Sequence, residues 1–211
     1  MPTIYFERHG QTDFSREEHL CGILDPPLNA IGLEMAEVVA ARCGRGPWAG
    51  IYSSPLLRTR QTAEAVARHV SLTVQLEPAF REIAYGEWEG MLVSEVKRLD
   101  GERYEAWAAR PADLSPPGGE TARQIAARAV PAIEGIVRRH PEGNVLVVSH
   151  KATIRVILCA LLGVDLNHFR IRIAAPVASL TAVDFKETGP LLTLLGDTSH
   201  LPEHLRNQKG T

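Results

Sequence analysis

Short apolar runs alternate along this chain with longer segments in which apolar residues recur at helical spacing. The runs at residues 4–6, 51–53, 72–76 and 144–149 are short and rich in β-forming residues, as buried strands are. Helical patterns at residues 31–43, 54–70, 120–139 and 150–162 lie between or after them. This alternation favours parallel strands covered by helices on both faces. We therefore expect an α/β protein, a three-layer α/β/α sandwich with a mostly parallel central sheet and two further strands at residues 178–185 and 191–195.

The 211 residues suit a single domain, and we expect one that spans residues 1–211. Residues 77–119 interrupt the alternation with two short helical segments and an irregular stretch rich in proline and glycine. Aromatic residues gather in this part of the chain: Phe80, Tyr85, Trp88, Tyr104 and Trp107. We expect a small helical lid that roofs a pocket and has its own core. The alternative is a satellite core with no role in binding.

The formal net charge of −2 and the absence of a long basic block argue against nucleic acid or an anionic membrane as the main partner. No apolar stretch approaches the ~20 residues of a membrane span. Cys21, Cys43 and Cys159 are widely spaced and form no CxxC pair, which is typical of reduced thiols. These features predict a cytoplasmic protein.

Two of the predicted strands end in a histidine, His9 in the stretch IYFERHG and His150 in VLVVSHK. If these strands are neighbours in a parallel sheet, both imidazoles lie at the carboxyl edge, where ligands bind. Gly10 would allow a tight turn and a close backbone approach to a ligand. Arg8, and Arg58 in the first turn of a helix, can converge on the same edge. Two arginines and two histidines without an acidic cluster indicate a phosphoryl-binding pocket.

Four stretches in order, RHGQT, SSPLLRTRQTA, REIAYGEWEG and VVSHKATIR, resemble the histidine phosphatase superfamily. That group includes cofactor-dependent phosphoglycerate mutases, α-ribazole phosphatases and metal-independent phosphoserine phosphatases. The resemblance implies a phosphoglycerate mutase-like fold and a phosphohistidine intermediate on His9, with Glu82 as proton donor. Arg8, Arg58 and His150 would hold the phosphate oxygens. The predicted substrate-binding set also includes Gly10, Thr12, Ser15, Cys21, Gly22, Tyr85 and Lys151.

For this chemistry His9 must be neutral, which its reference pKa of ~6.5 permits near neutrality. Glu82 must begin protonated, and we expect an apolar surround from Tyr85 and Trp88 to favour that form. The guanidinium groups supply the positive charge, so we expect neither a metal nor another cofactor.

Three positions differ from the residues that are common in the motifs of the superfamily. Ser15 stands where asparagine often contacts the phosphate, and Phe14 replaces a frequent tryptophan. Lys151 stands where glycine often follows the second histidine. A serine hydroxyl can still donate to phosphate, so these departures put one contact in question rather than the activity.

Other enzyme classes fit the sequence poorly. It contains neither an HExxH metal signature nor a phosphate-binding P-loop, and none of its three cysteines is followed six positions later by arginine. The scattered histidines include His200, the one expected nearest to the site.

We therefore expect a phosphatase that acts on a small phosphorylated metabolite, and the resemblance to the superfamily further implies a homodimer. Two alternatives stay open: a phosphoglycerate mutase with the same residues, and a catalytically idle protein that binds a phosphorylated ligand. The sequence leaves the identity of the ester undecided, since GMLVSEV resembles phosphoserine phosphatases and DTSHL resembles α-ribazole phosphatases.

Overall fold

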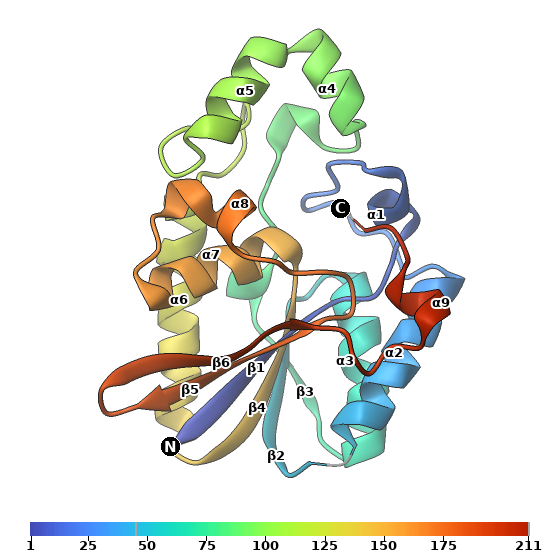
Figure 1. Ribbon diagram of the computed structural model, residues 1–211, viewed down its shortest axis with the longest axis vertical. Helices are drawn as coiled ribbons and strands as arrows, with labels where there is room; N and C mark the ends of the chain where they lie inside the picture. Colours follow the sequence, from blue (N-terminus) through green and yellow to red (C-terminus); the bar gives the residue numbers. More distant parts are fainter. Residues whose placement is uncertain (45, 211) are drawn as a thin grey trace.

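The computed structural model describes residues 1–44 and 46–210, and in these residues six strands form one sheet with the order β3-β2-β4-β1-β5-β6 (Figure 1). The strands are β1 (Pro2–Arg8), β2 (Trp48–Ser53), β3 (Val74–Leu76), β4 (Gly143–Ser149), β5 (Leu180–Lys186) and β6 (Gly189–Asp197). The pairs β1–β4, β2–β4 and β2–β3 are parallel. β5 is antiparallel to both β1 and β6. The expected mostly parallel sheet is confirmed, with an antiparallel hairpin at one edge.

Successive residues of β4 face opposite layers of helices. Val145 and Val147 are buried in one apolar cluster with residues of α6 (Ala122–Arg139) and α7 (Lys151–Leu162). Leu146 and Val148 are buried in a second cluster with residues of α2 (Ala30–Cys43) and α3 (Leu57–Val70). This period of two buries both faces of the sheet, as parallel sheets require. The three-layer α/β/α sandwich is therefore confirmed.

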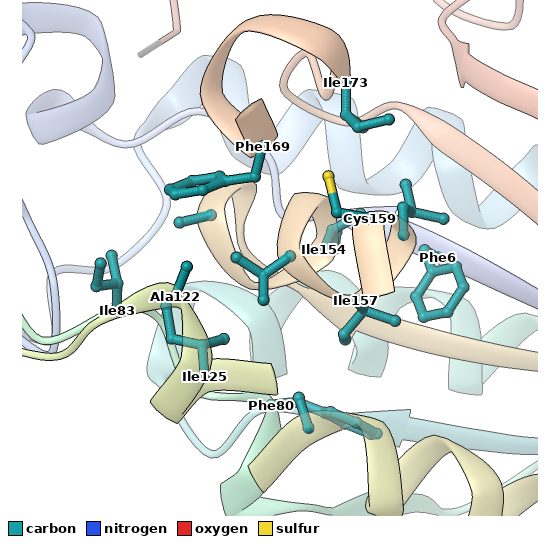
Figure 2. Packing of buried hydrophobic residues seen from close by; sticks show 14 of the residues in the cluster. Phe6, Phe80, Ile83, Ala122, Ile125, Ile154, Ile157, Cys159, Phe169 and Ile173 are labelled. Carbon is teal, nitrogen blue, oxygen red and sulfur yellow. The ribbon is translucent and has the colours of Figure 1, made fainter. Parts of the chain in front are cut away.

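The cluster beneath α6 and α7 joins the sheet to the helices that carry the site. Phe6 from β1, Ile157 from α7 and Ile125 from α6 all have no exposed surface, and Figure 2 shows how these side chains lie between the elements. Cys159 is buried in the same cluster. Cys21, Cys43 and Cys159 are all free thiols.

The helix boundaries follow from local capping chemistry. Asn29 precedes α2, and its side chain accepts a hydrogen bond from the Gly32 N–H at 2.8 Å. Thr121 caps α6 in the same way. The helix expected at residue 54 begins only at Leu57, because Leu56 is extended, with φ −69° and ψ 141°.

Residues 77–119 carry η1 (Pro78–Phe80), η2 (Gly86–Trp88), α4 (Val93–Leu99) and α5 (Gly101–Ala109). The rings of Tyr85, Trp88, Tyr104 and Trp107 contact one another, with centroids 5.6–5.9 Å apart. This aromatic group is continuous with the cluster under α6 and α7, so it is no separate core. Figure 1 shows α4 and α5 at the end of the molecule away from the amino terminus.

The remaining helices are α1 (Asp13–Glu17), η3 (Leu166–His168), α8 (Phe169–Arg172) and α9 (Glu203–Arg206). The segment after β6 is not a plain polar tail, because Leu201 and Leu205 are buried in one apolar cluster with residues of α2 and α3. No helix in the described ranges is both long and apolar enough to cross a bilayer.

Candidate active site

The two histidines predicted at strand ends meet at one edge of the sheet. β1 and β4 are parallel neighbours whose register pairs Arg8 with Ser149. The next residue of each strand is therefore a histidine at the same carboxyl edge, and the His9 N–H donates to the Ser149 carbonyl at 3.2 Å. The ring centroids of His9 and His150 lie 5.2 Å apart.

A cavity of about 660 Å³ opens at this edge. Most of the predicted site residues line it: Arg8, His9, Thr12, Ser15, Cys21, Gly22, Arg58, Glu82, Tyr85 and Lys151. His150 and Gly10 are buried and are not among the lining residues. Val93, Tyr104 and Trp107 also line it, so the 77–119 segment forms part of the cavity wall.

His9 is held in the form that a nucleophile needs. Its Nδ1 lies 2.7 Å from the Gly10 carbonyl oxygen. A carbonyl can only accept, so Nδ1 carries the proton and the lone pair is on Nε2. Burial lowers the pKa of His9 well below its ordinary value, and the charges of Arg58 and Arg8 lower it further. The ring is therefore neutral at pH 7, as the chemistry requires.

His150 is fully buried, and its Nε2 lies 2.8 Å from the Ser54 hydroxyl. Its Nδ1 has no hydrogen-bond partner within residues 1–44 and 46–210. Burial, followed by Arg58 and His9, lowers the pKa of this ring well below its ordinary value. From the sequence, Ser54 is expected only at the start of a helix; its contact with His150 depends on the neighbouring positions of β2 and β4.

Two guanidinium groups are buried at the cavity, each with 2 % of its surface exposed. Arg58, in the first turn of α3, donates to the carbonyls of Leu24 at 2.7 Å and Gly22 at 2.9 Å. Arg8 donates to the Ala175 carbonyl at 2.8 Å, and burial is the main reason that its pKa falls to about 9. With that pKa, Arg8 remains cationic at pH 7. Arg60, two residues after Arg58, does not line the cavity, and its guanidinium lies 3.7 Å from the Glu64 carboxylate.

Glu82 is held at the amino terminus of α7. Its carboxyl group accepts from the backbone N–H groups of Ala152 and Thr153 and from the Thr153 hydroxyl, each at 3.2 Å. The expected apolar surround is therefore wrong in part: Tyr85 lines the cavity, but Trp88 packs against Tyr104 and Trp107 instead. The helix terminus fixes where the carboxyl group points.

Thr12 and Ser15 form the capping box of α1, in which each side chain accepts from the backbone N–H of the other. The Ser15 hydroxyl also donates to the Thr12 carbonyl at 3.0 Å. Burial raises the pKa of the Cys21 thiol to about 11, so it is protonated at neutral pH. Gly22 adopts φ +52°, and its carbonyl accepts from Arg58.

Gly10 contacts the protein rather than the cavity. Its N–H donates to the Thr62 hydroxyl at 3.3 Å, and a Cβ there would lie 2.5 Å from the Gly32 carbonyl oxygen. The close backbone approach that the glycine permits is to the first turn of α2, not to a ligand. His200 likewise bonds the Ala178 carbonyl, at 3.0 Å, and does not line the cavity.

Several cavity residues were missed from the sequence. Besides the predicted Lys151, the cations Arg155, Arg170 and Lys97 line the cavity. Arg155 follows Lys151 by one helical turn, so helix periodicity alone could have placed the two on one face. Burial lowers the pKa of Lys151 to about 7, with Arg8 and Arg155 contributing.

The arrangement suits in-line transfer of a phosphoryl group. A neutral imidazole, two buried guanidinium groups and an oriented carboxyl group surround one cavity, and each has a distinct task in such a reaction. In the described ranges no three histidine, cysteine, aspartate or glutamate residues are grouped as metal ligands would be.

Comparison with known proteins gives a consistent result. The chain is 34% identical over 203 residues to phosphoserine phosphatase 1 of Hydrogenobacter thermophilus, covering 96% of each protein. It is 29% identical over 206 residues to a probable phosphoglycerate mutase, GpmB, of Yersinia pestis, covering 95% of each. The solved structure of Bacillus stearothermophilus YhfR matches with a TM-score of 0.89 and 28% identity, covering 95% of this chain and 99% of that one.

The sequence model of the histidine phosphatase superfamily (branch 1) matches residues 4–198, a range that begins in β1 and ends just beyond β6. It therefore includes both histidines, both buried arginines and Glu82. With this match over most of its length, the chain belongs to the histidine phosphatase superfamily.

Proposed function

We propose that this protein is a metal-independent phosphatase that hydrolyses a small phosphomonoester through a phosphohistidine on His9. The observation that carries the proposal is the state of the His9 ring. Its Nδ1 is committed to the Gly10 carbonyl at 2.7 Å, which leaves the Nε2 lone pair beside the buried guanidinium groups of Arg8 and Arg58.

The first step forms a bond between His9 Nε2 and phosphorus and breaks the bond between phosphorus and the ester oxygen. Glu82 gives its proton to that oxygen, and the alcohol leaves. Arg8, Arg58 and His150 bind the non-bridging oxygens and stabilise the charge that spreads over them. In the second step Glu82 takes a proton from water, which attacks phosphorus. The nitrogen–phosphorus bond breaks, and inorganic phosphate leaves.

The segment 77–119 acts as the lid of a single domain in this proposal. Its α5 contributes Tyr104 and Trp107 to the cavity wall, where they can contact the alcohol part of a small metabolite. We keep homodimer formation as part of the proposal, on the resemblance to the superfamily alone.

Phosphoglycerate mutase activity is the second candidate, because a relative 29% identical is named a probable phosphoglycerate mutase. Mutases share the phosphohistidine and pass its phosphoryl group to another hydroxyl instead of to water. The relative that is 34% identical is named a phosphoserine phosphatase, which favours hydrolysis.

The test is phosphate release from a panel of esters in EDTA, with the wild type beside His9→Ala. The panel contains p-nitrophenyl phosphate, phosphoserine, 3-phosphoglycerate, a sugar phosphate and α-ribazole phosphate, and phosphoglycerate isomerisation is followed in parallel. We expect turnover in EDTA that His9→Ala abolishes. The matched control His204→Ala, at an exposed histidine outside the cavity, should keep it.

Isomerisation faster than phosphate release would make the protein a mutase. Dependence on added metal would contradict the metal-independent mechanism. Ligand binding by a folded wild type without any turnover would favour the idle binding protein.

A further inference from the structure

Two basic side chains that the proposed mechanism does not use line the cavity from one face of α7. Lys151 and Arg155 are one helical turn apart, and both are only partly exposed. A cation removed from water costs free energy unless a counter-ion or hydrogen bonds compensate. The cavity therefore contains basic groups in addition to Arg8 and Arg58, which bind the oxygens of the transferred phosphoryl group.

Within the described residues, no hydrogen bond or ion pair holds the Arg155 side chain. Its buried Nε has no hydrogen-bond partner in the described part of the chain, and the guanidinium takes part in no ion pair there. Lys151 likewise has no ion pair within residues 1–44 and 46–210. An arginine in a cavity with its donors unused is suited to a ligand that brings acceptor oxygens.

The neighbouring Arg170 has a structural explanation that Arg155 lacks. It donates to the Tyr104 hydroxyl at 3.0 Å, and its guanidinium lies 4.3 Å from the centroid of the Trp107 ring. These contacts connect α8 to α5. The Trp107 Nε1, in a residue that lines the cavity with 2 % of its surface exposed, is a second buried donor with no partner in the described ranges.

Arg155 lies in the second turn of α7, the helix whose terminal N–H groups, from Ala152 and Thr153, hold the Glu82 carboxyl group. Burial lowers the pKa of Arg155, and the Glu82 carboxylate opposes that shift. Glu82 is the group assigned to protonate the leaving oxygen. A group that Arg155 binds would therefore belong to the alcohol, not to the phosphoryl group being transferred.

We propose that Lys151 and Arg155 form a second anion subsite, which binds a carboxylate or a second phosphoryl group on the leaving alcohol. This inference rests on the proposed phosphatase function and narrows its substrates to phosphomonoesters of anionic alcohols. The planar guanidinium can bind two oxygens of such a group side by side, and the ammonium adds a further charged donor. The bound anion would compensate the cost of burying both cations.

The experiment compares esters that differ in one anionic group. Phosphoserine is paired with phosphoethanolamine, which lacks the carboxylate, and 1,3-propanediol bisphosphate is paired with its monophosphate. We expect wild type to prefer the anionic member of at least one pair by about 10- to 100-fold in kcat/KM, as a charge-assisted hydrogen bond predicts. The pair that shows the preference identifies the anion.

Arg155→Gln should reduce this preference to nearly one, and Arg155→Lys should retain part of it. Arg172→Gln is the matched control, since it removes the same charge from an exposed position on α8 outside the cavity and should keep the full preference. If Arg155→Gln does not fold, as judged by circular dichroism, Lys151→Met takes its place.

Equal rates within both pairs for an active wild type would overturn the subsite and leave the phosphatase function intact. A preference unchanged by Arg155→Gln would also overturn it. If no ester is hydrolysed, calorimetry on the His9→Ala variant measures the binding of each ester instead. Tighter binding of phosphoserine or of the bisphosphate than of its partner, lost when Arg155→Gln is added, would support the subsite although hydrolysis had failed. Equal binding within both pairs would overturn it.

Discussion

The rings of His9 and His150 lie 5.2 Å apart with an angle of 62° between their planes, although the two residues are 141 positions apart in the sequence. Their adjacency follows from the parallel pairing of β1 with β4. Both rings are buried, and the same two arginines lower the pKa values of both. The site therefore keeps two neutral imidazoles between permanent cations.

The lowered pKa of His9 leads to a prediction about acid. Because only the neutral ring attacks phosphorus, and its pKa lies below 6.5 in the folded protein, the nucleophile stays active as the pH falls through 6.5. We expect the ¹⁵N signals of the His9 ring to report the neutral Nδ1-protonated form at pH 6.5. The ring signals of the exposed His204 serve as the comparison. The His9 signals are assigned as those that disappear in the His9→Ala variant. A His9 ring that is half protonated at or above pH 6.5 would contradict the burial argument.

Glu82→Gln tests the proton donor. Glutamine keeps the shape of the side chain but cannot supply a proton, so the loss should depend on how much the leaving group needs one. We expect kcat/KM for an alkyl phosphate to fall roughly 10²- to 10⁴-fold, and much less for p-nitrophenyl phosphate, whose leaving group is stable as an anion. Glu105→Gln, at an exposed glutamate on the cavity wall, is the matched control. An equal loss with both esters would assign Glu82 a structural role.

Ser54 is a positioning residue, because its hydroxyl contacts His150 Nε2 at 2.8 Å. Ser54→Ala removes that partner and should lower kcat about five- to tenfold, the worth of about one hydrogen bond. If Ser54 only contributed to stability, its replacement would not change the environment of the His150 ring. The NMR signals of that ring are therefore recorded in Ser54→Ala and in the wild type. Unchanged signals together with unchanged kcat would refute the assignment.

The backbone at residues 10–11 lies so close to Gly32 that we predict different effects of alanine at two helical glycines, Gly32 and Gly135. A Cβ on Gly32 would overlap the Gln11 carbonyl oxygen, and we expect Gly32→Ala to lower the free energy of unfolding by about 1–3 kcal/mol. Gly135→Ala, in α6, is the control. Among the described residues outside its own helix backbone, a new Cβ there would meet only the flexible Arg138 side chain, at 3.9 Å, so the free energy of unfolding should rise by up to about 1 kcal/mol. Chemical denaturation measures the free energy of unfolding of both variants. Equal effects would show that the backbone around Gly32 can move to accept a Cβ.

Local sequence determined the elements of the fold. The β-branched run of β4 has no exposed surface from Val145 to Val148, and such a run predicts a strand buried on both faces wherever the chain places it. Asn29 caps α2 for reasons contained within four residues. These features depend on side-chain periodicity and capping, which neighbouring residues determine.

Only the tertiary structure decided which groups meet. The α7 amides that hold Glu82, the Ser54 hydroxyl on His150 and the Gly32 carbonyl against Gly10 all join segments distant in the chain. The position of Arg155 at the cavity could not be predicted for the same reason. Its local sequence does not tell whether its helix face points toward solvent or toward a cavity. Hydrogen bonding and burial depend on the three-dimensional packing of separate elements, and a sequence pattern records only the spacing within each.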